Sequence, residues 1–196
     1  ISDTNRGVTI TQSTNTTING SSITNTEYPI NIASEGYIAY EGTNDFTGND
    51  NDVVYLSHAS NIDVNFTLEN PGIPYLPSGT KYVTTGDTLT IKKGNILKFN
   101  QNHQLYTQNG GVIIAEGTEA EPIYFTSNRN DNIGGDTNND GTASVPGNRD
   151  WNGITINGKS TSSSFKHVNV SFAGYVPHSS SSAYQGGITL VENNSQ

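Results

Sequence analysis

An acidic, asparagine-rich stretch at residues 129–151 holds the side chains best suited to chemistry. Asp136, Asn138 and Asp140 alternate within it and a glycine follows them, which is the spacing that opens an EF-hand-like calcium loop. Alternate residues place their oxygens on one side of a tight turn, and calcium is a hard cation that prefers oxygen ligands. The stretch therefore predicts a Ca2+ site.

The calcium motif is incomplete at its far end. Its twelfth position is Gly147, where an EF-hand loop carries a bidentate Glu. Asp131 or Asp150 would have to complete the set of ligands. The alternative is a solvated loop whose Asn and Asp side chains cap its own turns. The sequence leaves both interpretations open.

The composition of the chain excludes helical folds. Among 196 residues there are 26 Asn, 24 Thr and 20 Ser, and these residues, like Gly, are poor helix formers. β-Branched and aromatic residues recur in short runs bounded by Gly, Asn, Asp or Pro, a pattern typical of short strands. We therefore expect an all-β protein.

The charge and the chain start bear on partners and location. The net charge is −9, and an acidic surface repels phosphate backbones, so we expect no nucleic-acid partner. No apolar run approaches the ~20 residues of a membrane span. The chain begins at Ile1 and has no Met, which we interpret as a processed product or a segment of a longer protein. The polar, acidic composition favours an extracellular or cell-surface location.

Internal repeats indicate a solenoid. Residues 22–24 align with residues 45–47 at an offset of 23, and residues 29–32 align with residues 53–56 at an offset of 24. Each unit is a short strand, a polar corner and a second short strand, which favours stacked coils over a sandwich with longer strands. At roughly two dozen residues per coil, we expect roughly 8 coils stacked about 4.8 Å apart.

The predicted strands are short and separated by polar corners. They are Tyr82–Thr85, Leu89–Ile91, Ile96–Phe99, Gln104–Thr107, Val112–Ala115, Ile123–Thr126 and Gly153–Ile156. A long polar loop is expected at about 128–151. We divide the chain into N-terminal coils at 1–70, a Pro/Gly-rich connection at 71–82 without an interior strand, and a second group of coils at 83–196. One continuous solenoid is the alternative.

Residues 86–127 resemble secreted right-handed parallel β-helix proteins of the pectate-lyase-like superfamily. The shared motifs are Thr88-Leu89-Thr90-Ile91, Lys98-Phe99, Ile114-Ala115-Glu116-Gly117-Thr118 and Pro122-Ile123-Tyr124-Phe125-Thr126-Ser127. The resemblance continues through residues 134–142, 150–154 and 167–174, while residues 1–80 match only as generic coils. It implies a right-handed parallel β-helix, and it says little about function, because one fold serves many functions.

The leading functional interpretation is a non-enzymatic structural or adhesive segment of a microbial surface protein or filament. Both ends of the chain read as polar coils without a capping helix, and uncapped solenoid ends expose edge strands. We therefore expect neighbouring copies or flanking domains of the same protein as partners, with glycans as a further possible partner.

Two other functions stay open. A carbohydrate-binding module would use Tyr37, Tyr40 and Tyr55 exposed on one face. A calcium-dependent polysaccharide lyase, which the resemblance makes conceivable, would need Arg129 or Arg149 beside the metal.

Other residue types give no second site. The four histidines, His58, His103, His167 and His178, lack ligand spacing and are expected at the surface or at coil edges; there is no Cys. Trp151 is expected to pack the long loop onto the coils. Thr-x-Thr pairs do not recur at coil spacing, which argues against an ice-binding surface, and no Gly-x-Ser-x-Gly motif supports a serine hydrolase.

Overall fold

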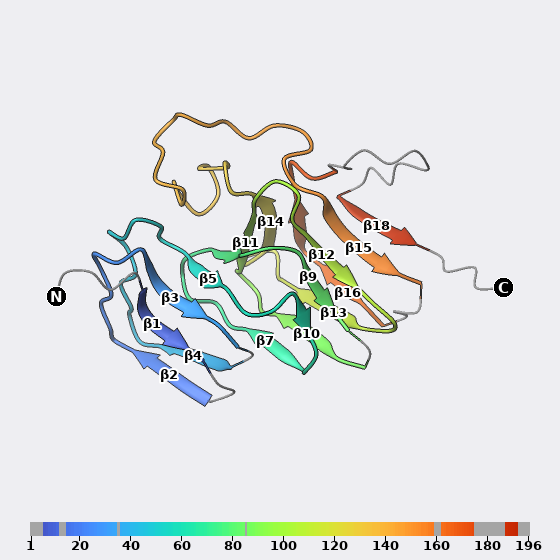
Figure 1. The fold of residues 1–196 in the computed structure, drawn as a ribbon, viewed down its shortest axis with the longest axis horizontal. Coiled ribbons are helices and arrows are strands. Elements are labelled where there is room, and N and C mark those ends of the chain that lie inside the picture. Colours follow the sequence, from blue (N-terminus) through green and yellow to red (C-terminus); the bar gives the residue numbers. More distant parts are fainter. Residues whose placement is uncertain are drawn as a thin grey trace.

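The chain forms a parallel β-helix (Figure 1). The computed structural model describes residues 6–11, 15–34, 36–84, 86–158, 162–174 and 187–191. Within these ranges every regular element is a β-strand and every strand pairing is parallel. The same ranges contain no helix that is long and apolar enough to cross a membrane. Parallel pairing excludes an antiparallel sandwich and confirms the predicted fold class.

Three faces of the coil each contribute a sheet. The long sheet contains β1 (Arg6–Ile10), β3 (Tyr28–Ile32), β5 (Val54–Leu56), β8 (Tyr75–Pro77), β11 (Ile96–Phe99), β14 (Ile123–Ser127) and β17 (Val168–Val170). The second sheet contains β6 (Asn61–Ile62), β9 (Lys81–Val83), β12 (Gln104–Thr107), β15 (Gly153–Asn157) and β18 (Ile188–Val191). The third face carries β7 (Phe66–Leu68), β10 (Thr88–Ile91), β13 (Val112–Glu116) and β16 (Ser164–Lys166), and β2 (Asn15–Asn19) pairs separately with β4 (Tyr37–Glu41).

The predicted repeats have the predicted register. Ser22 bridges Asp45, and Ile30 pairs with Val54. The number of coils is smaller than the roughly eight expected. This is seen from the long sheet, which has seven strands in the described part of the chain. The reason is that residues 128–152, between β14 and β15, form one long loop and add no strand to the stack.

The Pro/Gly-rich stretch at 71–82 contributes strands, contrary to the expectation that it has no interior strand. β8 lies there and pairs with β5 on one side and with β11 on the other. Pro77 is the last residue of β8, where its missing N–H disturbs only the end of the ladder. The long sheet therefore runs without interruption through 71–82.

Stacked apolar side chains form the core. Alternate residues of each strand point inward, so that residues at one register position pile up along the axis. On the long sheet one such column consists of Ile30, Val54, Tyr75, Leu97 and Phe125, and all of them are buried. Because burial of one such side chain contributes about 1.5–3 kcal/mol, these columns supply the main force that holds the coils together.

Asparagine side chains bond successive coils to each other at the corners. The Nδ2 atom of Asn49 donates to Phe46 O in its own coil at 2.9 Å and to Ile23 O in the preceding coil at 3.1 Å. Its Oδ1 atom accepts from the Thr26 N–H at 3.1 Å. One amide therefore satisfies backbone groups where the ladder of the strands stops.

The same corner arrangement occurs twice more. In each case Nδ2 donates to the carbonyl three residues earlier and to a carbonyl of the preceding coil. These acceptors are Glu41 and Ile18 for Asn44, and Lys92 and Leu68 for Asn95. The abundance of Asn in the sequence thus has a structural use beyond tolerance of turn geometry.

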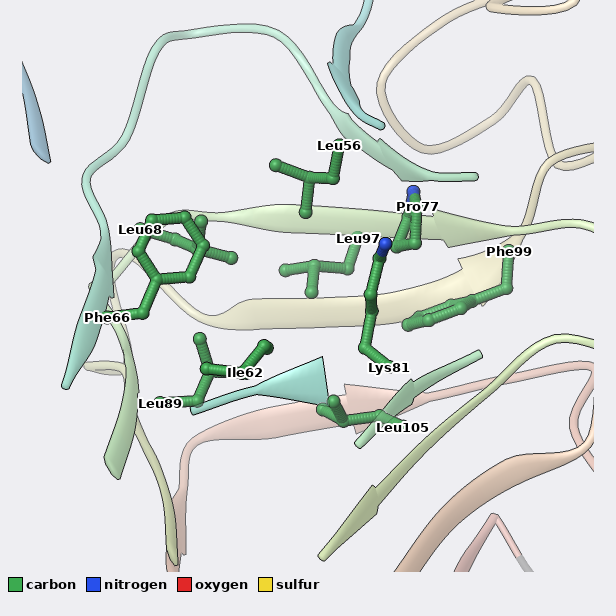
Figure 2. A pocket seen from close by; sticks show the side chains of 10 residues that line it. All are labelled: Leu56, Ile62, Phe66, Leu68, Pro77, Lys81, Leu89, Leu97, Phe99 and Leu105. Atoms are coloured by element: carbon green, nitrogen blue, oxygen red, sulfur yellow. The ribbon is translucent and has the colours of Figure 1, made fainter. Parts of the chain in front are cut away.

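A lysine interrupts the apolar interior. Lys81 occupies an inward position of β9, pairs with Leu105, and is 2% exposed. Figure 2 shows it among the apolar side chains that line a small interior cavity. Its Nζ atom donates to His58 O at 2.7 Å, so the ammonium group is satisfied by the backbone of the preceding coil.

His58 is buried beside this lysine, contrary to its expected position at the surface or a coil edge. It is 4% exposed and its ring lies edge-on to Phe66 at 5.6 Å. Neither ring nitrogen has a hydrogen-bond partner among the described residues. Burial, and secondly the charge of Lys81, lower the pKa of His58 to about 4.

Replacing the corner amide of Asn49 should destabilise the fold. Asn49→Ala leaves carbonyls of two coils and the Thr26 N–H without their partner, and we expect the free energy of unfolding to fall by about 1–3 kcal/mol. Urea unfolding measures it. The matched control is Asn61→Ala, an exposed position in β6, expected to change stability by less than about 0.5 kcal/mol. Equal losses in both variants would contradict the role of the corner.

The buried His58 should make the protein sensitive to mild acid. The unfolded chain binds a proton at a pKa of 6.5 and the folded chain only at about 4. Stability is therefore complete above the unfolded pKa, falls as the pH drops through this window, and levels off below it, with a total loss of about 3 kcal/mol. Urea unfolding at several pH values in this range gives the free energy of unfolding as a function of pH. This free energy should fall less steeply with decreasing pH in His58→Phe than in the wild type. Parallel slopes would contradict the prediction.

Candidate metal centre

The long loop at 128–152 is fastened to the outer surface of the long sheet. Lys98 is an outward residue of β11, yet it is fully buried. Its Nζ atom donates to Gly135 O at 2.6 Å and to Thr137 Oγ1 at 2.9 Å. Gly134 lies so close to the sheet that a Cβ atom there would be 2.5 Å from Pro74 Cγ. Lys98 is thus covered by the loop that it holds.

A buried polar network continues from this lysine. Thr137 is 1% exposed, and its hydroxyl accepts from Lys98 and donates to Asn128 Oδ1 at 3.0 Å. Nearby in the chain, Asn130 Nδ2 donates to Thr126 Oγ1 at 2.9 Å. The loop is therefore tied to β11 and β14 by hydrogen bonds that are shielded from water, where each bond is worth more than at the surface.

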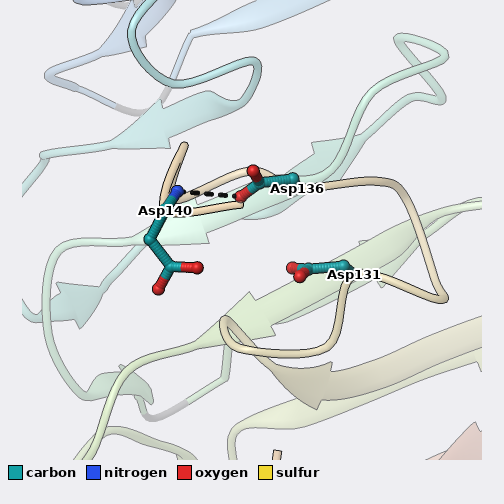
Figure 3. A group of neighbouring side chains, drawn as sticks. All are labelled: Asp131, Asp136 and Asp140. Carbon is teal, nitrogen blue, oxygen red and sulfur yellow. Dashed lines mark hydrogen bonds between the residues drawn. The ribbon is translucent and has the colours of Figure 1, made fainter. Parts of the chain in front are cut away.

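Three predicted ligands meet in this loop. The carboxylates of Asp131, Asp136 and Asp140 each place an oxygen within 4.8 Å of the others (Figure 3). Asp136 accepts from the Asp140 N–H at 3.2 Å and from the Gly141 N–H at 2.8 Å, which closes a tight turn. Gly141 has a φ of 66°, as the motif requires at its glycine.

The electrostatics of the trio favour a cation. Burial, and then the charge of Asp136, raise the pKa of Asp131, and the charge of Lys98 opposes this rise. Burial also lowers the pKa of Lys98 to about 8, although Asp131 and Asp136 oppose that shift. The Lys98 ammonium group interacts with Asp131 and Asp136 but not measurably with Asp140, so a divalent cation would relieve the repulsion that remains among the three carboxylates.

The available oxygens fit calcium. Asp131 Oδ1 and Asn138 Oδ1 are buried and have no hydrogen-bond partner in the described part of the chain. Asn138 Nδ2 donates to Asp140 Oδ2 at 2.8 Å, which places this amide beside the trio. Buried acceptors without a donor are costly unless something positive contacts them. The donors are all oxygens, the set that calcium prefers.

Asp150, the fifth predicted ligand, lies in a different cluster. Its Oδ2 atom accepts from Ser127 Oγ at 2.8 Å and from the Gly147 N–H at 3.1 Å. Its Oδ1 atom lies 3.5 Å from Arg129 Nη1. The structure therefore uses Asp150 to close the loop onto β14 and does not bring it into the acidic trio.

Trp151 packs the loop onto the coils, as predicted. It is fully buried, its ring stacks on Phe99 with centroids 4.3 Å apart, and Nε1 donates to Ser171 O at 2.9 Å. Neither His103, which is half-buried, nor His167, which is exposed, belongs to the trio, and His178 lies outside the described residues.

The three tyrosines proposed for sugar binding do not share a face. Tyr37 donates its hydroxyl to Glu69, and the Tyr40 hydroxyl is buried. Tyr55 belongs to the long sheet and stacks on Tyr28 with centroids 4.4 Å apart. This expectation is wrong, because β4 and β5 lie on different sides of the coil.

Sequence reasoning missed Lys98 and Thr137 as functional residues. Lys98 stands between two apolar residues and reads as an exposed outward position of a strand. The only indication was the length of the polar loop, since a long ordered loop must rest on some surface.

Comparison with known proteins identifies the family. A profile described as "Pectate-lyase like beta helix domain" matches residues 59–185, more than half of the chain. No curated protein and no solved structure gives a match. The profile covers both the coils that carry the resemblance and the long loop, and the observed parallel coils agree with it. The chain therefore belongs to the family of pectate-lyase-like β-helix domains.

Proposed function

We propose that the chain is a non-enzymatic structural or adhesive segment of an extracellular microbial surface protein, with a long loop that calcium holds on the long sheet. The observation that carries the calcium part of the proposal is the pair of unpartnered buried oxygens, Asp131 Oδ1 and Asn138 Oδ1, beside the acidic trio. Asp131, Asp136, Asp140 and Asn138 would hold the ion. Calcium would supply positive charge that neutralises the carboxylates.

The use of the basic side chains supports a structural role. A lyase would need a base beside the metal, but Lys98 is committed to Gly135 O and Thr137 Oγ1. Arg129 pairs with Asp150, which lies outside the trio. The family contains both enzymes and non-enzymes, so membership alone does not decide between them.

The partners that we propose are further coils, from neighbouring copies or from flanking parts of the same protein. Among the described strands, β1 and β17 are the outer strands of the long sheet and each pairs on one side. A parallel strand edge of this kind presents N–H and C=O groups to another strand.

Calcium should stabilise the fold and protect the loop. At a hundredfold excess over Kd, binding would add about 2.7 kcal/mol to the free energy of unfolding. We expect Ca2+ to raise Tm and to slow trypsin cleavage after Arg129 and Arg149, and EGTA to reverse both effects. Asp136→Asn should lose most of the response.

The control for this experiment is Asp63→Asn, which removes one exposed acid far from the motif in the sequence. It should respond to calcium as the wild type does. Equal loss in both variants would indicate general screening of charge, and no response of the wild type would refute the calcium site.

A lyase assay tests the non-enzymatic part of the proposal. Polygalacturonate incubated with the protein and Ca2+ should give no unsaturated products, as followed by ultraviolet absorbance. Calcium-dependent product formation that disappears in Asp136→Asn would overturn the proposal and assign a lyase.

A further inference from the structure

Four Asn-Gly pairs occur in the chain: Asn19-Gly20, Asn109-Gly110, Asn152-Gly153 and Asn157-Gly158. In such a pair the glycine amide nitrogen can attack the side-chain amide of the asparagine, because glycine has no Cβ to hinder the approach. The attack requires that the glycine N–H and the asparagine side chain are free to move. The fold treats the four pairs differently.

Two pairs are restrained by bonds to the neighbouring coil. The Gly20 N–H donates to Glu41 O at 3.3 Å, and Asn19 Nδ2 donates to Glu41 Oε2 at 3.2 Å. The Gly158 N–H donates to Val191 O at 2.6 Å, and Asn157 is 8% exposed. In both pairs the attacking nitrogen is already engaged as a donor.

The pair at 152–153 is restrained by burial. Gly153 is buried and begins β15, where it pairs with Gln104. Asn152 donates its N–H to His103 O at 2.9 Å and its Nδ2 to Asn102 O at 3.2 Å. Its side chain would have to break this bond before it could react.

The pair at 109–110 is the exception. It forms the turn between β12 and β13, with φ of 51° at Asn109 and 94° at Gly110, and the Gly111 N–H closes the turn on Gln108 O at 2.9 Å. Asn109 is exposed. In the described part of the chain neither its side chain nor the Gly110 N–H makes a hydrogen bond.

We propose that Asn109 is a site of spontaneous modification, at which the folded chain deamidates itself ahead of its other Asn-Gly pairs. Gly110 N bonds to Asn109 Cγ, the Cγ–Nδ2 bond breaks, and ammonia leaves with the proton of the Gly110 amide. Water then opens the cyclic imide at either carbonyl, giving aspartate or isoaspartate. Water is the only co-reactant.

Isoaspartate at this turn would strain the corner. It routes the main chain through the side-chain carbon and so lengthens the turn. The turn has little room, because a Cβ atom at Gly111 would lie 2.1 Å from Val83 O, and the Gln108 N–H donates to that same carbonyl at 2.8 Å. Modification should therefore weaken the packing of β13 against the preceding coil, to which Val83 belongs.

Peptide mapping by mass spectrometry tests the proposal. The native protein is aged in warm, mildly alkaline buffer and digested with trypsin, which puts Asn109 in one peptide, Asn152 and Asn157 in a second, and Asn19 in a third. We expect the exchange of NH2 for OH to accumulate first at Asn109, and the isoaspartyl residue to accept a methyl group from isoaspartyl methyltransferase.

Two controls separate the effect of the fold from that of the sequence. The same protein aged in urea should modify all four pairs at similar rates, since each has glycine next to asparagine. Asn109→Gln should remove the native-state methylation, whereas Asn152→Gln should leave it unchanged. Native modification that is equal at the four pairs, or absent at Asn109, would overturn the proposal.

Discussion

Each coil of this protein must satisfy the backbone of the coil before it, and the corners are where that requirement is hardest to meet. Along the strands the parallel ladders suffice, but at a corner the ladder stops and carbonyl groups would be left without donors. The amides of Asn44, Asn49 and Asn95 fill this gap by donating to two coils at once. Side chains thus continue the hydrogen bonding that the strands begin, and the backbone carbonyls at these three corners keep donors where the coils turn sharply.

The strands were predictable from the sequence where local pattern decides them. The strands at 96–99 and 104–107 have their predicted bounds, because alternation of apolar and polar residues is a local property. Lys81 was not predictable in the same way. A lysine at the start of a strand reads as solvated, and its burial depends on the carbonyl of His58 in another coil. The register that brings these two residues together is a property of the whole stack.

The residues of the candidate site likewise fall into two groups, those that the local sequence predicts and those that only the fold brings together. Asp136 and Asp140 were predictable because their spacing within one turn is enough to bring them together. Asp150 was expected to join them, but the turn that follows carries it back to Ser127. Lys98 contacts Gly135, which lies 37 residues further along the chain, so no local sequence pattern predicts this contact. The sequence spacing was enough to predict the acidic residues, whereas the surface of the long sheet on which their loop rests could be found only from the structure.

The uneven spacing of paired residues along the long sheet has a consequence for how the chain folds. Ile10 pairs with Ile32, but Phe125 pairs with Val170, so the connecting segment roughly doubles in length toward the C-terminal side. Each doubling adds about 0.6 kcal/mol of closure entropy. The evenly spaced coils should therefore assemble first and act as a template, onto which the later coils add in sequence order. Such directional growth suits a chain that emerges from its amino end.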